Sequence, residues 1–445
     1  MDGSKEMLVR DLALGRFASN IMDRFEDSLA KQLDLHDPLA PFRNEFYVPS
    51  GTIYLDGNSL GPLTRAGETA LKEALEAWRE KAIGGWLEAN PPWFDLAEHV
   101  ATLLAPLIGA DPTEVILANS TTVNLHQLLA TFYEPRSGRD CILIDEVAFP
   151  TDRYAVDSHL RLRGQPVDRC RRLVPSRDGR TLSETDIIGS LDESVQIAIL
   201  PSVIYTSGQL LDLPAVVSAA HRHGVLIGFD CSHSVGVVPH QLSEWGVDFA
   251  FFCTYKYLNG GPGAPAAIFV HRRHHGRMPG MAGWFGNQKE TQFQMDSVFT
   301  PAPGARAFQM GTPPILSMAP LVGSLSLIRD AGMTAIRAKS QRLTSHLRQW
   351  LLDQNHSHEL TFADPEDAEQ RGGHVALVHR DAGAISRALR REGVIVDFRP
   401  PDIVRLAPAP LYTSFVDCWN AAAIVGRLLR DHGYRSELTV PDRIP

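Results

Sequence analysis

The chain has 445 residues, of which 44% are hydrophobic, so it is long enough for two or three domains with substantial cores. Its 52 acidic residues outnumber its 43 Lys and Arg residues and give a formal net charge of −9, which argues against nucleic acid or an anionic membrane as a partner. The five cysteines are scattered and form no CxxC pair, so we expect no disulfide framework, no metal site and a cytoplasmic location.

The first half of the sequence alternates between helical and strand patterns. Apolar residues at helical spacing from Leu12 to Leu29 predict an N-terminal helical arm, followed by a loop. Beyond it, the pattern predicts helices at 66–82, 121–133, 151–164 and 213–224, and strands at 114–119, 141–146, 195–201, 225–230 and 247–253. Short apolar strands between helices predict a mostly parallel sheet with helices on both faces.

The C-terminal part predicts a second, smaller α/β domain. A long helical stretch at about 315–353 is followed by strand, helix, strand and helix patterns at 374–380, 384–393, 402–408 and 419–433. We therefore divide the chain into an N-terminal arm that includes part of the small domain (1–65), a large domain (66–315) and a small C-terminal domain (316–445).

Three segments at predicted strand ends carry polar groups suited to one ligand. In NSTTVN (119–124), hydroxyl groups and free amides at a helix start favour an anion, although an ordinary N-cap is the simpler reading of this segment alone. In FDCSH (229–233), Asp230 ends an apolar strand, where it either pairs with a cation or caps the next helix.

The third segment is CTYKYLNGG (253–261), in which Lys256 follows another buried strand, 26 residues after Asp230. Lysine is seldom fully buried, so the alternatives are a solvated turn lysine and an amine held in a cleft. Pyridoxal phosphate requires a lysine for a Schiff base and a partner for its ring nitrogen. Together, the three segments predict a pyridoxal-phosphate site.

Two loops offer aromatic residues for this site. AFPTD (148–152) supplies Phe149 for stacking and Asp152 for a hydrogen bond, unless it is a plain turn. GWFGN (283–287) supplies Trp284 and Phe285, although aromatic residues in such a loop more often serve packing.

From about residue 50 to about residue 425, the chain resembles the kynureninases, pyridoxal-phosphate enzymes of fold type I that are related to class V aminotransferases. The motifs that carry the resemblance are IYLDGNSLGP (53–62), TTVNLHQLL (121–129), AFPTDRYA (148–155), GFDCSHSVG (228–236), WGVDFAFFCTYKYLNGGPG (245–263), GWFG (283–286), GTPP (311–314) and VRLAPAPLYTSF (404–415). The most specific are TYKYLNGGPG and GWFG. The resemblance implies a large cofactor-binding domain, a smaller α/β domain and a homodimer with shared active sites.

The resemblance also implies a role for each matching residue. Lys256 would form the Schiff base, Asp230 would pair with the ring nitrogen and Tyr255 would complete the catalytic set. The cofactor would further contact Thr121, Thr122, Phe149, Pro150, Thr151, Asp152 and His233, together with Trp284 and Thr312 from the neighbouring subunit. The substrate would contact Asn58, Ser59, Trp86, Phe285 and Arg405, with Arg405 binding the α-carboxylate through a planar guanidinium.

The sequence departs from the family pattern around the aryl pocket and the cofactor. Pro201 stands where many members have Ser or Thr, with Ser202 next to it, and Ile204 replaces a polar residue. Trp86 occupies the place of the histidine of animal members, and Thr312 the place of their asparagine.

The implied reaction is hydrolysis of the Cβ–Cγ bond of L-kynurenine, or of a ring-substituted kynurenine, to an anthranilate and L-alanine. Lys256 would act as the base, and Tyr255 either as a proton donor or only as a phosphate ligand. The alternatives are an aminotransferase or another lyase of this fold acting on an unusual amino acid, and an inactive binding protein. A cysteine desulfurase is disfavoured, since no cysteine lies between Cys253 and Cys418.

Overall fold

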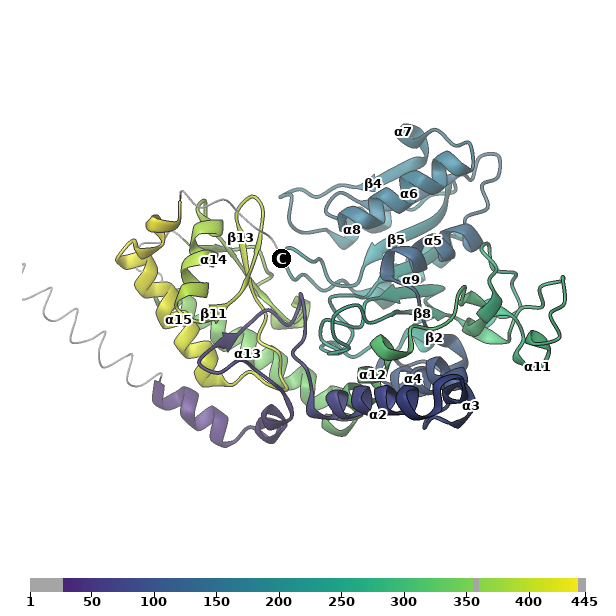
Figure 1. The fold of residues 1–445 in the computed structure, drawn as a ribbon. Helices are drawn as coiled ribbons and strands as arrows, with labels where there is room; N and C mark the ends of the chain where they lie inside the picture. Colours follow the sequence, from purple (N-terminus) through teal and green to yellow (C-terminus); the bar gives the residue numbers. More distant parts are fainter. Residues whose placement is uncertain (1–26, 355–359, 439–445) are drawn as a thin grey trace, which may run out of the picture.

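The structure is a computed structural model and describes residues 27–354 and 360–438. The predicted arm from Leu12 to Leu29 therefore lies almost wholly outside the described residues. Figure 1 shows a larger domain, mostly teal, beside a smaller one in light green and yellow. None of the helices in the described ranges is long and apolar enough to cross a membrane.

A seven-stranded sheet forms the centre of the larger domain, with strand order β2-β8-β7-β6-β5-β3-β4. Its strands are β2 (Val115–Ala118), β3 (Cys141–Asp145), β4 (Arg171–Val174), β5 (Val195–Pro201), β6 (Leu226–Asp230), β7 (Phe249–Phe252) and β8 (Ala266–Val270). Only β8 runs opposite to the other six strands, so the predicted mostly parallel sheet is confirmed. The sequence patterns did not predict β4 and β8: β4 is an edge strand that begins with two arginines, and β8 begins with two alanines, which have low β propensity.

Helices pack against this sheet and against one another. The main helices of the larger domain are α2 (Arg65–Lys81), α4 (Leu96–Leu104), α5 (Thr121–Phe132), α6 (Pro150–Leu162), α8 (Glu184–Gly189) and α9 (Leu213–Arg222), and the short ones are α3 (Gly85–Glu88), α7 (Val167–Cys170), α10 (Leu242–Trp245) and α11 (Lys289–Gln292). The helix α12 (Ile315–Ala331) packs against α2 and α4. Ser120 caps α5 through Val123 N, as its place before a helical pattern suggested. The predicted helix over 315–353 is in fact two helices, because Gly332, with φ +77°, ends α12 before α13 (Met333–Gln354).

The smaller domain is built on a four-stranded antiparallel sheet, in the order β12-β13-β10-β9. Its elements are β9 (Thr361–Phe362), β10 (Val375–Val378), α14 (Ala382–Arg391), β12 (Asp397–Arg399), β13 (Ile403–Leu406) and α15 (Phe415–Arg430). The N-terminal β1 (Ile53–Tyr54) pairs with β11 (Val394–Ile395) of this domain. A hydrophobic core of its own, which includes Trp350 and Phe415, holds this domain together.

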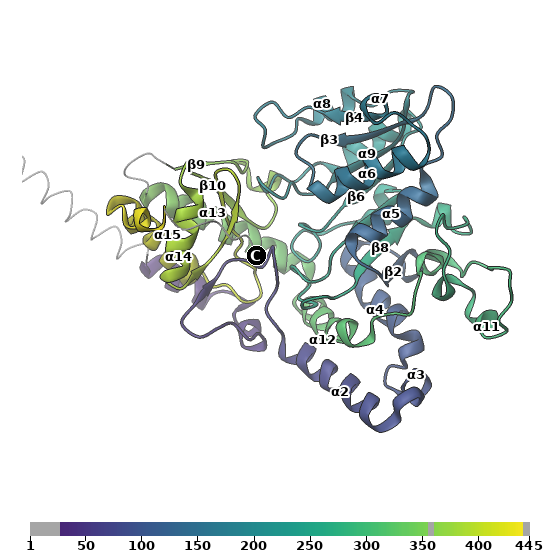
Figure 2. The same cartoon turned by 45° about the horizontal axis from the view of Figure 1, so that its top comes forward.

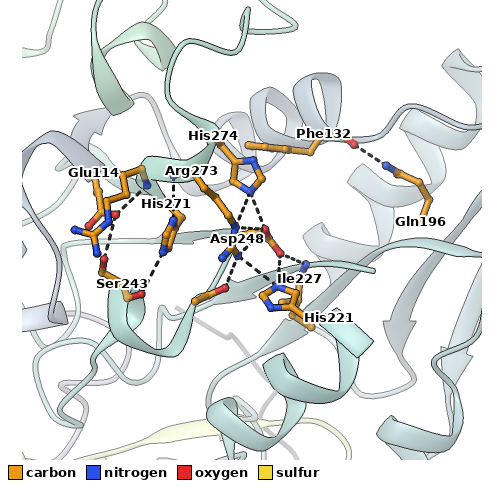
Figure 3. A network of polar contacts seen from close by, with 12 residues as sticks. Glu114, Phe132, Gln196, His221, Ile227, Ser243, Asp248, His271, Arg273 and His274 are labelled. Carbon is orange, nitrogen blue, oxygen red and sulfur yellow. Dashed lines mark hydrogen bonds and ion pairs between the residues drawn. The ribbon is translucent and has the colours of Figure 1, made fainter. Parts of the chain in front are cut away.

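At the edge of the large sheet where β6 and β7 begin, the buried carboxylate of Asp248 forms a network of polar contacts (Figure 3). Asp248 accepts hydrogen bonds from Ile227 N at 2.8 Å and Arg273 Nη2 at 2.7 Å, and contacts the ring nitrogens of His221 and His274. Burial alone would raise the pKa of Asp248, but these partners hold it well below its usual value. The network ties β6 and β7 together at one edge, so the residues that follow them at the other edge keep fixed positions.

Candidate active site

Asp230 and the loop that carries Lys256 emerge from adjacent strands at the same edge of the sheet. Strands β6 and β7 are parallel neighbours, with Asp230 opposite Phe251, so their carboxyl ends lie side by side. Ligands of open α/β sheets bind at this edge. Lys256 Nζ lies 2.8 Å from Nε2 of His233, which follows β6.

Three carboxylates lie in this region and influence one another. Burial raises the pKa values of Asp230, Asp152 and Asp145, that of Asp145 to about 7, and the negative charges of Asp230 and Asp145 raise the pKa of Asp152 further. The positive charge of Lys256 opposes these shifts at Asp152 and Asp230. Such a cluster favours a cation, and a protonated ring nitrogen is one.

The starts of α5 and α6 meet beside these carboxylates. The hydroxyl groups of Thr122 and Thr151, in the first turns of the two helices, lie 2.8 Å apart. Two helix N-termini provide free N–H groups for an anion such as a phosphate. Thr121 and Pro150 are the first residues of α5 and α6, and the half-exposed ring of Phe149 stands edge-on to Tyr205 at 5.2 Å.

Arg405, on β13 of the smaller domain, is completely buried and reaches across to the larger domain. Its Nε donates to Asp397 Oδ2 at 2.6 Å, its Nη1 to the Tyr205 carbonyl at 2.7 Å and its Nη2 to Ser59 Oγ at 3.3 Å. Asn58 is also completely buried. These contacts bring the predicted substrate residues Arg405 and Ser59, the latter next to Asn58 in the chain, to the junction of the two domains.

Tyr255 and Lys256 are held in place by the backbone of the DGNSLGP motif. Gly61 N donates to the Tyr255 carbonyl at 2.8 Å, and a side chain at Gly61 would collide with the Lys256 carbonyl and with Asn259. The absence of a side chain at position 61 therefore allows the two motifs to approach each other. The Tyr255 side chain is half-buried, and the neighbouring Cys253 together with burial raises its pKa.

The predicted aryl-pocket residues form a separate cluster. The Trp86 ring lies 6.0 Å from that of Phe285, which in turn lies 5.5 Å from that of Trp284. In Figures 1 and 2, α3 and α11, which flank this cluster, lie at the end of the larger domain farthest from the smaller domain. Trp284 and Thr312 are exposed to solvent in the single chain. The structure thus does not bring these residues to Lys256 within one chain.

Several residues at the junction were not predicted from the sequence. Asp397 and Arg399 contact each other at 2.9 Å, and both lie on the sheet face that carries Arg405. His374 and Tyr205 lie beside His233, with ring centroids 6.3 and 6.4 Å away. The spacing of Asp397 and Arg399 could have indicated this arrangement. They are two residues apart in β12, and side chains two residues apart on a strand point to the same face. The hydroxyl of Ser202, which follows Pro201 in the chain, contacts Ser234 Oγ at 2.6 Å.

Unpaired polar atoms inside the protein gather at this junction and test whether pyridoxal phosphate fits. Asp152 Oδ1, His233 Nδ1 and both amide atoms of Asn58 are buried without a hydrogen-bond partner among the described residues. Buried polar groups are nearly always paired in folded proteins, so such a group of atoms indicates the site of a polar ligand. An amine, cation-binding carboxylates and two helix N-termini match the aldehyde, the ring nitrogen and the phosphate of this cofactor.

Solved structures with the same fold define the class of the protein. The chain aligns with a mutant of the cystine C–S lyase C-DES that has glycine covalently linked to its PLP cofactor, with a TM-score of 0.76, 18% identity and coverage of 86% of this chain and 98% of that one. It also aligns with the cysteine desulfurase CsdA from Escherichia coli, with a TM-score of 0.72, 17% identity and coverage of 88% and 98%. At such identity the likeness shows the fold alone, that of fold type I pyridoxal-phosphate enzymes.

The sequence relatives identify the family. The chain is 49% identical over 407 residues to the kynureninase of Geobacillus thermodenitrificans (strain NG80-2), covering 91% of this chain and 95% of the relative. It is 47% identical over 406 residues to the kynureninase of Bacillus cereus (strain ATCC 10987 / NRS 248), with the same coverage. Residues 336–425 match the family model "Kynureninase C-terminal domain". The chain belongs to the kynureninase family.

The desulfurase alternative finds no support beyond the shared fold. Cys418, the cysteine nearest the C-terminus, is completely buried in α15, where it is unsuited to act as a mobile nucleophile.

Proposed function

We propose that the chain uses pyridoxal phosphate to hydrolyse the Cβ–Cγ bond of L-kynurenine to anthranilate and L-alanine. The observation that carries this proposal is the 49% identity to a kynureninase over 91% of the chain. The site supports it, because Lys256 and Asp230 share one sheet edge and Arg405 lies across the domain junction from them.

In this proposal the chain's own residues hold each end of the cofactor. Lys256 binds the aldehyde carbon, Asp230 pairs with the protonated ring nitrogen, and Thr121, Thr122 and Tyr255 surround the phosphate. When bound, pyridoxal phosphate supplies an electron sink for the carbanion that develops on the substrate. Phe149 and His233 pack beside the ring, while Pro150, Thr151 and Asp152 line it from the start of α6.

The residues around the substrate orient it and move its protons. Arg405 binds the α-carboxylate, with Ser59 and Asn58 beside it. Once the substrate amine has displaced it from the aldehyde carbon, the freed Lys256 amine would take the α-proton, and His233 Nε2, 2.8 Å from Lys256 Nζ in this structure, is placed to accept a hydrogen bond from it. Tyr255 is the candidate acid that donates a proton when the Cβ–Cγ bond breaks, since a phenol is protonated at neutral pH and this one directly precedes Lys256 in the chain.

We also propose a homodimer in which Trp284 and Thr312 of one chain complete the site of the other, together with the adjacent Trp86 and Phe285. The aromatic cluster lies at the far end of the larger domain and has large exposed apolar neighbours there, among them Ile83, Leu87 and Phe293. An exposed apolar patch of this kind favours association with another protein surface. The five cysteines, all buried and unpaired, support a cytoplasmic location.

The test compares wild type with Lys256→Ala and with the control Lys72→Ala, which changes an exposed lysine of α2. Wild type and the control should release anthranilate and alanine from L-kynurenine in equal amounts. Lys256→Ala should lose this turnover and also the visible absorption and borohydride-dependent labelling that a lysine-bound cofactor gives. Formation of a keto acid instead of alanine, or a labelled Lys256→Ala chain, would contradict the proposal.

A further inference from the structure

His374 is a buried histidine at the junction that none of the steps above uses. It directly precedes β10, in which Ala376 pairs with Arg405 of β13, so His374 lies on the sheet face that carries Arg405. Its side chain is completely buried, and its ring lies 6.3 Å from that of His233 in an edge-on arrangement.

The nitrogen atoms of these two histidines are incompletely paired. Neither ring nitrogen of His374 has a partner with full hydrogen-bond geometry among the described residues, and neither does Nδ1 of His233. Buried polar atoms in folded proteins are normally paired, directly or through water. The two rings are too far apart for a direct hydrogen bond, but one water molecule spans such a gap.

The surroundings of both rings keep them neutral. Burial is the main cause that lowers the pKa of each histidine, that of His374 to about 3, and the positive charges of Lys256, Arg399 and Arg405 act in the same direction. The backbone of Thr206 acts on His374 in the opposite direction, as a carbonyl near a ring N–H does. A neutral imidazole has one N–H donor and one acceptor nitrogen, so an N–H that faces Thr206 leaves the other nitrogen as an acceptor.

The contact between His233 and Lys256 then selects one tautomer. An ammonium group has three donors and no acceptor, so when Lys256 carries a proton, His233 Nε2 must accept and Nδ1 must carry the hydrogen. That N–H is buried and needs an acceptor, and His374 is a buried ring nearby with a free acceptor nitrogen.

We propose that His374 is a positioning residue, which accepts the hydrogen bond of His233 Nδ1 through one bridging water and so keeps His233 Nε2 available to Lys256. This inference rests on the proposed function, in which Lys256 accepts the α-proton of the substrate. It assigns His374 to the proton-transfer step and not to binding of the substrate.

The experiment uses the cofactor-loaded enzyme with His374→Phe, which removes both nitrogens, and His374→Gln, which retains an acceptor. His159→Phe is the matched control, because it makes the same change at another buried histidine. His374→Phe should lower kcat by about 10- to 100-fold, the usual effect of losing a partner that orients an active-site group, with KM changed less than about threefold. His374→Gln should recover most of the lost rate, and the control should retain it.

A second readout does not depend on turnover. The pH titration of the visible absorption of the bound cofactor should shift its midpoint in His374→Phe and return in His374→Gln, because His233 then changes its hydrogen bonding to the lysine. If His374→Phe does not fold, His374→Leu, with a smaller side chain, replaces it in both measurements. A wild-type kcat and titration midpoint in a folded apolar variant would overturn the inference. Lack of kynurenine turnover in wild type would instead count against the proposed function.

Discussion

Arg405 and Asp397 form an ion pair in which both side chains are completely buried. Arg399 approaches the same carboxylate oxygen at 2.9 Å, so one negative charge faces two positive charges at this point. The pair fixes the guanidinium on its strand and leaves Nη1 to donate to the Tyr205 carbonyl of the larger domain. Asp397 is therefore a positioning residue for the group that we expect to bind the substrate carboxylate.

Replacing Asp397 with alanine should destabilise the protein strongly. Removal of one partner leaves Arg405 as an uncompensated buried charge, which costs about 3–5 kcal/mol of unfolding free energy. The control Asp402→Ala removes a partner of Arg180 at a half-buried pair and should cost about 1 kcal/mol or less. Urea unfolding of both variants checks the difference, and equal midpoints would refute the structural role of Asp397.

Asp230→Asn should reduce kcat on the order of 10³-fold even when the enzyme is saturated with cofactor, because a neutral amide no longer holds the ring nitrogen protonated. Asp145→Asn changes a neighbouring buried carboxylate and should have a much smaller effect. Steady-state kinetics of L-kynurenine cleavage at saturating cofactor gives the comparison. If the two variants lose similar amounts of activity, the pairing assigned to Asp230 is wrong.

Mixed dimers should reveal sharing of the active site. Lys256→Ala and Trp284→Ala chains should each have low activity alone, and a mixture that exchanges subunits should regain activity, because one of the two sites then contains both intact residues. Thr312→Ala in place of Trp284→Ala provides a second pair. Absence of recovery after exchange has been verified by mass spectrometry would exclude a contribution across the interface.

The aryl pocket should favour a ring without a hydroxyl group. Trp86 and Phe285 offer apolar walls, and a hydroxyl group buried without a partner costs about 1–3 kcal/mol, or roughly tenfold to a hundredfold in specificity. We expect kcat/KM for L-kynurenine to equal or exceed that for the 3-hydroxy substrate. A preference above about tenfold for 3-hydroxykynurenine would show that a polar group, such as Thr312, binds the ring substituent.

Acid should destabilise the fold partly through His159. Burial, together with the charges of His126 and Arg163, lowers the pKa of His159 to about 4, whereas the unfolded chain has the ordinary value of about 6.5. Between these values the unfolded chain binds more protons, so this contribution to stability is complete above pH 6.5 and declines as the pH falls toward 4. The Tm difference between pH 7.5 and pH 5 should therefore be smaller in His159→Leu than in wild type. The exposed control His223→Gln should retain the wild-type difference, and a similar reduction in both variants would contradict this account.

The sequence predicted those parts of the structure that depend on local pattern. Apolar runs such as 195–201 and 225–230 became central parallel strands, because strands buried on both faces need continuous apolar side chains. Asp230 and Lys256 could be paired from the sequence, since Asp230 ends one such strand, Lys256 lies a few residues beyond the next, and the two strands are neighbours. The family resemblance added the residues that no periodicity marks, among them Asn58 and Arg405.

The parts that depend on tertiary contacts could not be predicted in the same way. The ion pair of Arg405 with Asp397 depends on the register of β12 and β13, which no local pattern determines. The proximity of His374 to His233 depends on how the two domains meet, since the residues are 141 positions apart in the sequence. Edge strand β4 was missed because its half-exposed positions carry arginines, which give no apolar run.

One hydrogen bond of Arg405 ends on the backbone carbonyl of Tyr205, although the two residues belong to different domains. A carbonyl is present whatever side chain occupies position 205, so natural substitution at that position cannot remove the acceptor. The guanidinium therefore links the two domains in addition to its expected role in binding a ligand. A substrate carboxylate that accepts a hydrogen bond from Nη1 must compete with the Tyr205 carbonyl for it. Substitutions that change the angle between the domains, such as those around Gly332 between α12 and α13, are then expected to change substrate affinity as readily as substitutions in the pocket itself.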